Sequence, residues 1–378
     1  MLLVGGGVAS VRCARTLRRE GFDGRILLVG DEPAPPYNRP PLSKELLRDD
    51  LPDDLVVAEP ARWYERRRVD LRTGVAVVSL DPDAGSAAMT DGRRITFDRC
   101  LVATGAAARE LSVPGAAEAL TLRTLADARR LRERALTAGV GGPVVVIGGG
   151  FIGVEVASSL AALGLRPTIV ERSDLLWSGA LGTLMAGWAM ERLAAAGVEV
   201  RTGASVTAVE PEAVAIGPER LPAAWSVVGV GVVPRDGLAR DAGLEVDDGI
   251  LTDAAHRTSH PAIWAAGDVA RVAGRRIEHW HAARDGGERA ARSMLGIGTC
   301  EPVEPWTFSE VAGVAIDVVG APTRWDDEVW IDPGRLAAFL VDGRVVQLAS
   351  IASAMDAEVM RGLVAGGANT AEVRAAAG

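Results

Sequence analysis

The chain has 378 residues, 48% of them hydrophobic and 24% charged, a composition that excludes disordered and fibrous proteins and allows two to three domains. Its formal net charge of −9 argues against a general nucleic-acid binder. No apolar run reaches the roughly 20 residues that a membrane-spanning helix needs, and the opening residues leave no room for a secretory signal, so we expect a cytoplasmic protein that binds neither nucleic acid nor membrane.

The first 31 residues predict a strand, a glycine-rich turn, a helix and a second strand. Apolar residues 2–4 precede the turn Gly-Gly-Gly-Val-Ala-Ser, and residues 25–29 predict the second strand. Gly5 and Gly7 allow the backbone to approach a pyrophosphate at the helix N-terminus. Ser10 occupies the third position of this motif and is small enough for close helix packing. The turn therefore predicts a dinucleotide site.

The next segment is rich in predicted strands. Residues 71–98 alternate apolar and polar side chains and contain turn residues. They lead into a strand at residue 100 that ends at Thr104 and Gly105.

The strand, turn, helix and strand pattern then occurs a second time. Residues 144–147 predict a strand, Gly148-Gly149-Gly150-Phe151-Ile152-Gly153 the turn, residues 154–163 a helix and residues 166–170 the following strand. Both copies stand in the context that the glycine motif requires, so the chain predicts two nucleotide-binding domains of the doubly wound α/β class.

Acidic residues follow the strands of both copies. Asp31 and Glu171 are placed to accept hydrogen bonds from the ribose of an adenosine. Glu171 favours NADH, because its carboxylate repels the 2′-phosphate of NADPH, although the adjacent Arg172 leaves NADPH open. Gly267 and Asp268, at a later strand end, offer a carboxylate to a ribitol chain. These positions predict FAD in the first domain and a nicotinamide nucleotide in the second.

The last part of the chain predicts a separate α+β domain. A strand at residues 225–230, followed by Gly231, ends the second nucleotide-binding unit. Further strands are predicted at residues 314–319, 336–341 and 344–351, and a helix at residues 355–365.

Several motifs in order resemble one family. They are Tyr-Asn-Arg-Pro-Pro-Leu-Ser-Lys (37–44), Val-Ala-Thr-Gly (102–105), Leu-Arg-Thr-Leu-Ala-Asp (122–127), Gly-Gly-Gly-Phe-Ile-Gly-Val-Glu (148–155), Ala-Gly-Asp (266–268), Arg-Ile-Glu-His-Trp (276–280) and Pro-Trp (305–306). Over nearly its whole length the chain resembles the FAD-dependent NAD(P)H:ferredoxin reductases of the putidaredoxin reductase and dioxygenase type. These belong to the pyridine nucleotide-disulfide oxidoreductase superfamily.

The resemblance implies the residues of the two cofactor sites. It implies FAD contacts at Ala9, Asp31, Arg39, Lys44, Val77, Arg123, Asp268 and Trp280. It also implies a catalytic ion pair between Lys44, the sole lysine of the chain, and Glu155 beside the flavin, with Glu155 expected two residues into its helix.

The resemblance also implies the domain order and the reaction. We expect residues 1–112 and 247–300 to form the FAD domain, 113–246 the NAD domain and 301–378 the C-terminal α+β domain. The implied reaction takes hydride from NADH and passes electrons singly to a [2Fe-2S] ferredoxin that serves a cytochrome P450 or a ring-hydroxylating oxygenase. Monomer and dimer both stay open.

One departure from the family keeps two alternatives open. After Pro-Trp the family pattern resembles Phe-Trp-Ser-Asp-Gln, and here it is Thr307-Phe308-Ser309-Glu310-Val311. A biosynthetic flavin oxidase or redox enzyme on the same scaffold, or an NADH-sensing flavoprotein without rapid turnover, would fit a chain that has lost its ferredoxin partner.

The cysteines and histidines predict neither dithiol nor metal chemistry. Cys13, Cys100 and Cys300 lie far apart and form no C-x-x-C motif. Two of the four histidines flank Trp280, with no third ligand nearby. The arginine run at residues 66–68 is interpreted as a solvated face that an acidic ferredoxin could dock on.

Overall fold

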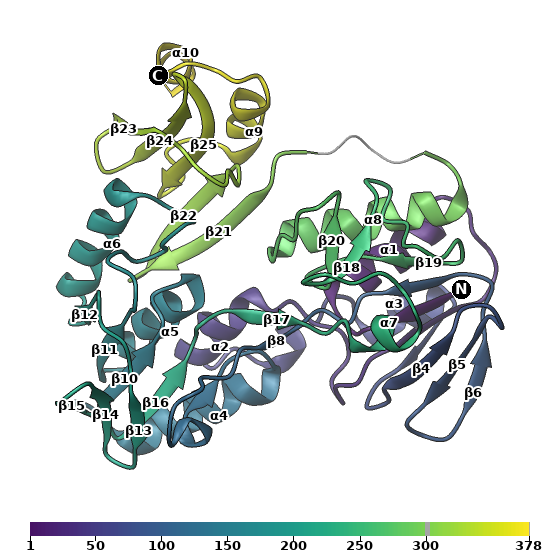
Figure 1. Cartoon of the computed structure of the whole chain (residues 1–378), viewed down its shortest axis with the longest axis horizontal. Helices are drawn as coiled ribbons and strands as arrows, with labels where there is room; N and C mark the ends of the chain where they lie inside the picture. Colours follow the sequence, from purple (N-terminus) through teal and green to yellow (C-terminus); the bar gives the residue numbers. More distant parts are fainter. Residues whose placement is uncertain (299–302, 378) are drawn as a thin grey trace. The chain divides into compact units, whose positions relative to one another are not determined.

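The computed structural model in Figure 1 describes residues 1–298 and 303–377. Cys300 and the expected boundary between residues 300 and 301 lie outside these residues. The chain divides into two compact units. Unit 1 holds Met1–Arg39, Pro52–Ala107 and Val232–Pro302, and unit 2 holds Pro40–Leu51, Ala108–Gly231 and Val303–Gly378. The division into FAD, NAD and C-terminal domains stays a prediction.

A parallel five-stranded sheet forms the centre of unit 1. Its order is β19 (Ile263–Ala265), β7 (Cys100–Val102), β1 (Leu2–Val4), β2 (Ile26–Val29) and β3 (Val69–Arg72). Leu2 pairs with both Leu27 and Cys100, so the first βαβ unit is formed as predicted. The β1 and β2 side chains are buried throughout, as expected for a strand covered on both faces.

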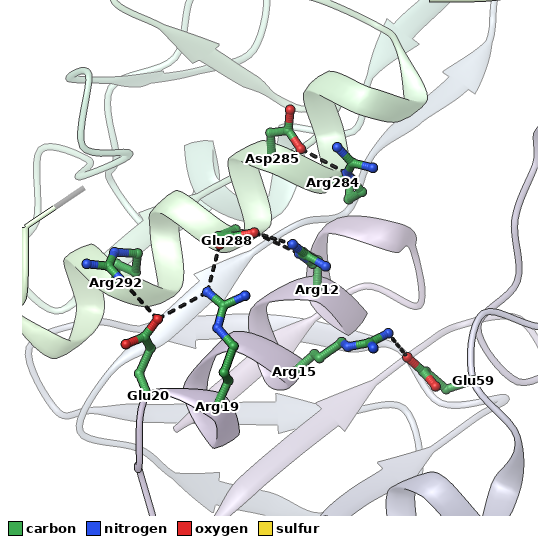
Figure 2. A network of polar contacts seen from close by, with 9 residues as sticks. All are labelled: Arg12, Arg15, Arg19, Glu20, Glu59, Arg284, Asp285, Glu288 and Arg292. Atoms are coloured by element: carbon green, nitrogen blue, oxygen red, sulfur yellow. Dashed lines mark hydrogen bonds and ion pairs between the residues drawn. The ribbon is translucent and has the colours of Figure 1, made fainter. Parts of the chain in front are cut away.

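Two helices of unit 1 pack closely against each other. They are α1 (Val8–Arg19) and α8 (Trp280–Leu295). A Cβ atom on Gly287 of α8 would lie 2.2 Å from the carbonyl oxygen of Ala9 in α1, so the backbones approach as only glycine permits. Figure 2 shows ion pairs along this seam, where Glu288 contacts Arg12 and Arg19.

Unit 1 contains further helices and strands outside this sheet. They are α3 (Ala61–Arg66), the antiparallel strands β4 (Val77–Asp81), β5 (Ser86–Met89) and β6 (Arg94–Thr96), α7 (Gly237–Asp241), the paired strands β18 (Ile250–Thr252) and β20 (Ala270–Val272), and one short 3-10 turn, Asp53–Leu55. β8 (Ala106–Ala108) pairs with β17 (Val232–Pro234).

A second parallel sheet lies in unit 2. Its order is β12 (Glu199–Arg201), β11 (Arg166–Val170), β10 (Pro143–Ile147), β16 (Trp225–Val228) and β9 (Leu120–Thr121). The helices of this part are α2 (Glu45–Arg48), α4 (Leu125–Ala138), α5 (Phe151–Ala162) and α6 (Thr183–Ala195), with 3-10 turns at Pro40–Ser43 and Ala116–Glu118, and a small sheet holds β13 (Ala208–Glu210), β14 (Ala213–Ile216) and β15 (Glu219–Pro222).

The helix that follows the second glycine turn starts earlier than predicted. It begins at Phe151 rather than at residue 154, because Gly150 is its extended N-terminal cap and Gly153 lies within the first turn. A Cβ on Gly153 would lie 2.0 Å from the carbonyl oxygen of Gly148. The glycine motif and the helix therefore overlap, and Glu155 is the fifth residue of α5, not two residues into it.

The C-terminal part of unit 2 is an antiparallel sheet with two helices. The strand order is β21 (Trp306–Val311), β22 (Val314–Val319), β25 (Arg344–Ile351), β24 (Leu336–Val341) and β23 (Asp327–Asp332), followed by α9 (Ala357–Ala365) and α10 (Thr370–Ala377). The three strands expected here are confirmed at their bounds. The helix begins at Ala357 because the Asp356 carboxylate accepts the backbone N–H groups of Glu358 and Val359.

These sheets confirm the expected fold class, with two doubly wound parallel sheets and a C-terminal α+β part. Of the helices in the described residues, none is both long and apolar enough to cross a membrane.

Candidate active site

The first glycine turn leaves the N-terminus of α1 open. Gly5 has φ +115°, and a Cβ there would lie 2.1 Å from the carbonyl oxygen of Ala103. Gly7 caps α1, no side chain caps the helix, and a Cβ on Gly7 would meet nothing within 4 Å. The first turn of α1 thus has no side-chain cap and has open space at Gly7, which is the arrangement that the pyrophosphate of FAD requires.

The two acids after β2 have different partners. Asp31 is half exposed and pairs with Arg235 at 2.8 Å, whereas Glu32 pairs with Arg39 at 2.8 Å and accepts a hydrogen bond from Tyr37. Burial disfavours the charge on Arg39, but Tyr37 and Glu32 outweigh it and raise the pKa of the guanidinium above its ordinary value. The Arg39 guanidinium is therefore a fixed cation next to the acids that follow β2, where the sequence predicts a contact with FAD.

Trp280 opens α8 and is held by polar neighbours. Its indole N–H donates to the Asn38 side-chain oxygen at 3.0 Å, and the Arg284 guanidinium lies 5.4 Å from the ring centroid. Gly267, next to Asp268, has φ +77°, and a Cβ there would lie 3.3 Å from that of Ala9. Trp280 is half-buried, so it is not a plain core aromatic.

The structure places the other predicted FAD contacts as follows. Ala9 and Ser10 are buried in α1, Val77 is half-buried in β4, Thr104 donates to the Arg235 carbonyl, Gly105 has φ +69°, and Arg123 and Lys44 belong to unit 2.

The second glycine turn repeats the open geometry in unit 2. Gly148 has φ +111°, and a Cβ there would lie 2.4 Å from the Gly229 carbonyl oxygen. Gly150 caps α5, and a Cβ on it would meet nothing within 4 Å. Phe151 stacks on Trp177, with ring centroids 5.6 Å apart. Ile152 beside them is 44% exposed, so an apolar side chain and free N–H groups share the first turn.

Glu171 is bound into this turn. Its carboxylate accepts the backbone N–H of Gly149 at 2.6 Å and that of Ser173 at 2.7 Å. It is therefore fixed against the glycine motif and is not a freely solvated strand end. Gly231, the last predicted nicotinamide contact, has φ +93° and open space at its Cβ position.

Lys44 and Glu155 form a buried ion pair within unit 2. The Lys44 ammonium lies 3.1 Å from Glu155 Oε2, and the two side chains are 9% and 4% exposed. Removing either partner would leave an uncompensated buried charge. Their role in hydride transfer stays a prediction.

Three side chains that sequence reasoning missed complete this cluster. Ser43 donates to Glu155 Oε2 and Ser309 to Oε1, while the Phe308 ring lies 5.7 Å from the Lys44 ammonium. Ser43 precedes Lys44 in the same motif, so it could have been found. Ser309 is 154 residues from Glu155, and no local pattern connects them.

The described cysteines are buried. Burial raises the pKa of the Cys13 and Cys100 thiols well above the ordinary value, so neither is a ready nucleophile. Over residues 1–298 and 303–377, no three His, Cys, Asp or Glu side chains gather as a metal site.

His256 makes unit 1 sensitive to acid. It is buried, its Nδ1 lies 2.9 Å from the Ala265 carbonyl oxygen, and burial lowers its pKa from 6.5 to about 4. The unfolded state takes up the proton first, so stability is lost as pH falls through this window. We expect the free energy of unfolding to fall by about 3 kcal/mol from this group between pH 6.5 and 4. Denaturant unfolding across that range measures it.

The matched variants are His256→Asn and His260→Asn. In His256→Asn, the free energy of unfolding should decline less between pH 6.5 and 4 than in the parent protein. In His260→Asn it should decline as in the parent, because His260 is partly exposed beside Asp83. An equal decline in His256→Asn and the parent would contradict the assignment.

Comparison with known proteins identifies the family. The chain belongs to the pyridine nucleotide-disulphide oxidoreductases, whose family model matches residues 1–287. It is 37% identical over 330 residues to the ferredoxin reductase component of chlorobenzene dioxygenase from Cupriavidus sp. (strain PS12), covering 84% of this chain and 80% of that protein. It is 31% identical over 340 residues to rubredoxin-NAD(+) reductase of Pseudomonas putida, covering 86% and 88%.

Solved structures agree with this family. The structure of the covalent putidaredoxin reductase–putidaredoxin complex superposes with a TM-score of 0.91 at 28% identity, covering 97% of this chain and 93% of that one. The ferredoxin reductase for the CYP199A2 system from Rhodopseudomonas palustris gives 0.88 at 29% identity, covering 93% and 90%. The chain is thus an oxidoreductase of this family.

Proposed function

We propose that the protein takes hydride from NADH and passes electrons singly to a [2Fe-2S] ferredoxin, and through it to an oxygenase, in the cytoplasm. The observation that carries this proposal is the pair of glycine-lined helix N-termini at Gly7 and Gly150, neither of which has a side-chain cap. Relatives that are named as ferredoxin reductases of dioxygenase systems support it.

The chain's own residues hold and orient the two cofactors in this proposal. Gly5 and Gly7 bring backbone N–H groups to the FAD pyrophosphate, and Asp268 offers its carboxylate to the ribitol. Bound FAD supplies a group that accepts two electrons together and releases them one at a time. The turn at Gly150 holds the nicotinamide nucleotide, and the buried Lys44 ammonium favours negative charge on the flavin.

Glu171 should set the preference for NADH. Changing Glu171→Gln removes the charge that repels a 2′-phosphate, so the ratio of kcat/KM for NADH over NADPH should fall about tenfold. Steady-state assays with both donors measure this ratio. Glu191→Gln, an exposed change in α6, should keep the parental ratio. Equal efficiency with both donors in the parent protein would contradict the assignment.

The acceptor is tested by reduction of cytochrome c. With NADH, the rate should depend on added [2Fe-2S] ferredoxin and saturate with it. Rubredoxin is the informative competitor, because one relative is a rubredoxin reductase. A rate of cytochrome c reduction that does not change when ferredoxin is added would overturn the proposal.

One observation favours a second candidate function, that of a flavin oxidase. Phe308 stands where the family pattern has Trp, and it lies beside the Lys44 ammonium. An oxidase would consume dioxygen with NADH, and added ferredoxin would not raise its rate of NADH oxidation. A stable complex of reduced protein with negligible turnover would instead support the sensing alternative.

A further inference from the structure

The loop between β11 and α6, residues 171–182, binds both backbone polar groups of Gly149 within unit 2. The Gly149 N–H donates to the Glu171 carboxylate at 2.6 Å, and the Gly149 carbonyl accepts the backbone N–H of Trp177 at 2.9 Å. A Cβ on Gly149 would lie 2.6 Å from Leu176 Cδ2, so the loop packs directly on the glycine turn. The peptide groups on both sides of Gly149 are therefore fixed by this loop.

Trp177 has a backbone conformation that bulky residues rarely adopt. Its φ is +55°, in the left-handed region where a side chain crowds the following carbonyl oxygen. Its N–H donates to Gly149, and its carbonyl accepts the N–H groups of Ala180 and Leu181 at 2.8 and 3.0 Å. Such a conformation persists only where the surrounding structure fixes it, and it is found preferentially at functional sites. Here the strained residue is the one that holds the Gly149 carbonyl.

The Trp177 side chain is buried against the first turn of α5. Its ring stacks on Phe151 with the ring planes 29° apart, and only 2% of the residue is exposed. Its indole N–H has no hydrogen-bond partner among the described residues. Because a buried indole N–H usually has a partner, the stacking on Phe151, and not a polar contact, accounts for the place of this ring.

The C-terminal sheet of unit 2 also holds this loop. Gln347 in β25 is buried, and its amide donates to the Ala180 carbonyl at 2.9 Å. Ala180 in turn donates its own N–H to the Trp177 carbonyl. Where the loop ends, the Glu328 carboxylate in β23 accepts the backbone N–H of Thr183 at 2.9 Å. The loop is thus bound to the glycine turn through Trp177 and to the C-terminal sheet through Ala180.

We propose that Trp177 is a positioning residue for the nicotinamide nucleotide that the second glycine turn binds. It holds the Gly149 carbonyl and the Phe151 ring, so the turn has its binding conformation before the nucleotide arrives and ordering it costs no affinity. Trp177 is almost fully buried and acts through the turn. This inference rests on the proposed function, because it assumes that a nicotinamide nucleotide binds at residues 148–153.

The test measures the dissociation constant of NAD+ by titration calorimetry on the FAD-loaded protein. Trp177→Leu keeps an apolar side chain in the core and removes the stacked ring, so the dissociation constant should rise about fivefold. With ferricyanide as the electron acceptor, KM for NADH should rise by a similar factor while kcat stays near the parental value, because a loss of uniform binding raises KM alone. Trp177→Phe keeps a ring that can stack on Phe151 and should restore parental binding.

The matched control is Trp188→Leu. Trp188 lies in α6 and packs against the same apolar core as Trp177, so this change removes an indole from that core without altering the loop at residues 171–182. It should lower the melting temperature and leave the dissociation constant of NAD+ at the parental value. The pair of variants separates positioning of the turn from a general loss of packing.

A second variant acts on the loop from the C-terminal sheet. Gln347→Met removes the amide that donates to Ala180 while keeping a side chain of similar length. The dissociation constant of NAD+ should rise in this variant too. If Trp177→Leu folds too poorly to load FAD, Gln347→Met decides the question.

The inference is overturned if Trp177→Leu binds NAD+ as tightly as the parent, or if Trp188→Leu weakens binding by the same factor. Where Trp177→Leu does not fold, a parental dissociation constant in Gln347→Met overturns it. A parent protein that binds no NAD+ would overturn the proposed function itself. Because no ferredoxin is present in these measurements, failure of the proposed acceptor would leave this test intact.

Discussion

Lys44→Met should slow reduction of the bound flavin by NADH by about 10- to 100-fold and lower the flavin midpoint potential, with FAD still bound. The Lys44 ammonium is buried and paired with Glu155, so its charge is poorly screened by solvent and acts strongly on its surroundings. Stopped-flow absorbance under anaerobic conditions measures the rate. We expect FAD to stay bound in this variant, because the glycine turn at Gly5 and Gly7 and the Asp268 carboxylate are unchanged and belong to unit 1.

Three further variants make the Lys44 prediction specific. Arg134→Met removes an exposed positive charge from α4 and should reduce at the parental rate. Lys44→Arg should rescue only in part, because a planar guanidinium differs from a compact ammonium. Glu155→Gln should affect the same step, and its combination with Lys44→Met should be clearly non-additive. A parental rate and potential in Lys44→Met would make Lys44 a structural lysine only.

Gly287→Ala should destabilise unit 1 by about 2 kcal/mol or more, even though alanine favours helices. The added methyl group would lie 2.2 Å from the Ala9 carbonyl oxygen, and backbone cannot give way as a side-chain tip can. The displaced α1 should also weaken FAD binding, because the glycine turn leads directly into it. Thermal unfolding and FAD titration measure the two effects.

The control for Gly287 is the same change in another helix. A Cβ on Gly187 in α6 meets nothing within 4 Å, so Gly187→Ala should raise stability by up to about 1 kcal/mol. The partly exposed ion pairs of Glu288 along the α1–α8 seam (Figure 2) are expected to add little each. An unchanged melting temperature in Gly287→Ala would show that α1 and α8 can move apart without a loss of stability.

Periodic features of the sequence predicted the scaffold well. Strands such as Arg166–Val170 and Val314–Val319 were predicted at their bounds, because burial on both faces or alternation leaves a short-range pattern. The predicted start of α5 is three residues too late, because the sequence pattern assigns Gly153 to the turn although it is helical. Glycine permits both conformations, and its close approach to the Gly148 carbonyl oxygen inside the helix is a packing contact that the sequence does not display.

The sequence predicts the ion pair between Lys44 and Glu155, which the structure contains, but not the side chains that support the predicted site residues. Lys44 and Glu155 stand in motifs that carry the family resemblance. The partners Arg235 of Asp31 and Ser309 of Glu155 come from distant segments, and their side chains have no periodicity or motif of their own. Such contacts depend on how the strands and helices are packed, which a single sequence does not display.

The most direct test of the account is the reoxidation of the protein after stoichiometric reduction by NADH. The reduced protein is mixed in a stopped-flow instrument with a [2Fe-2S] ferredoxin, with a rubredoxin, or with dioxygen, each at the same concentration. Reoxidation should be fastest with the ferredoxin, its rate should rise with ferredoxin concentration, and the ferredoxin should appear in its one-electron reduced form. Fastest reoxidation by dioxygen, with no response to ferredoxin, would contradict it.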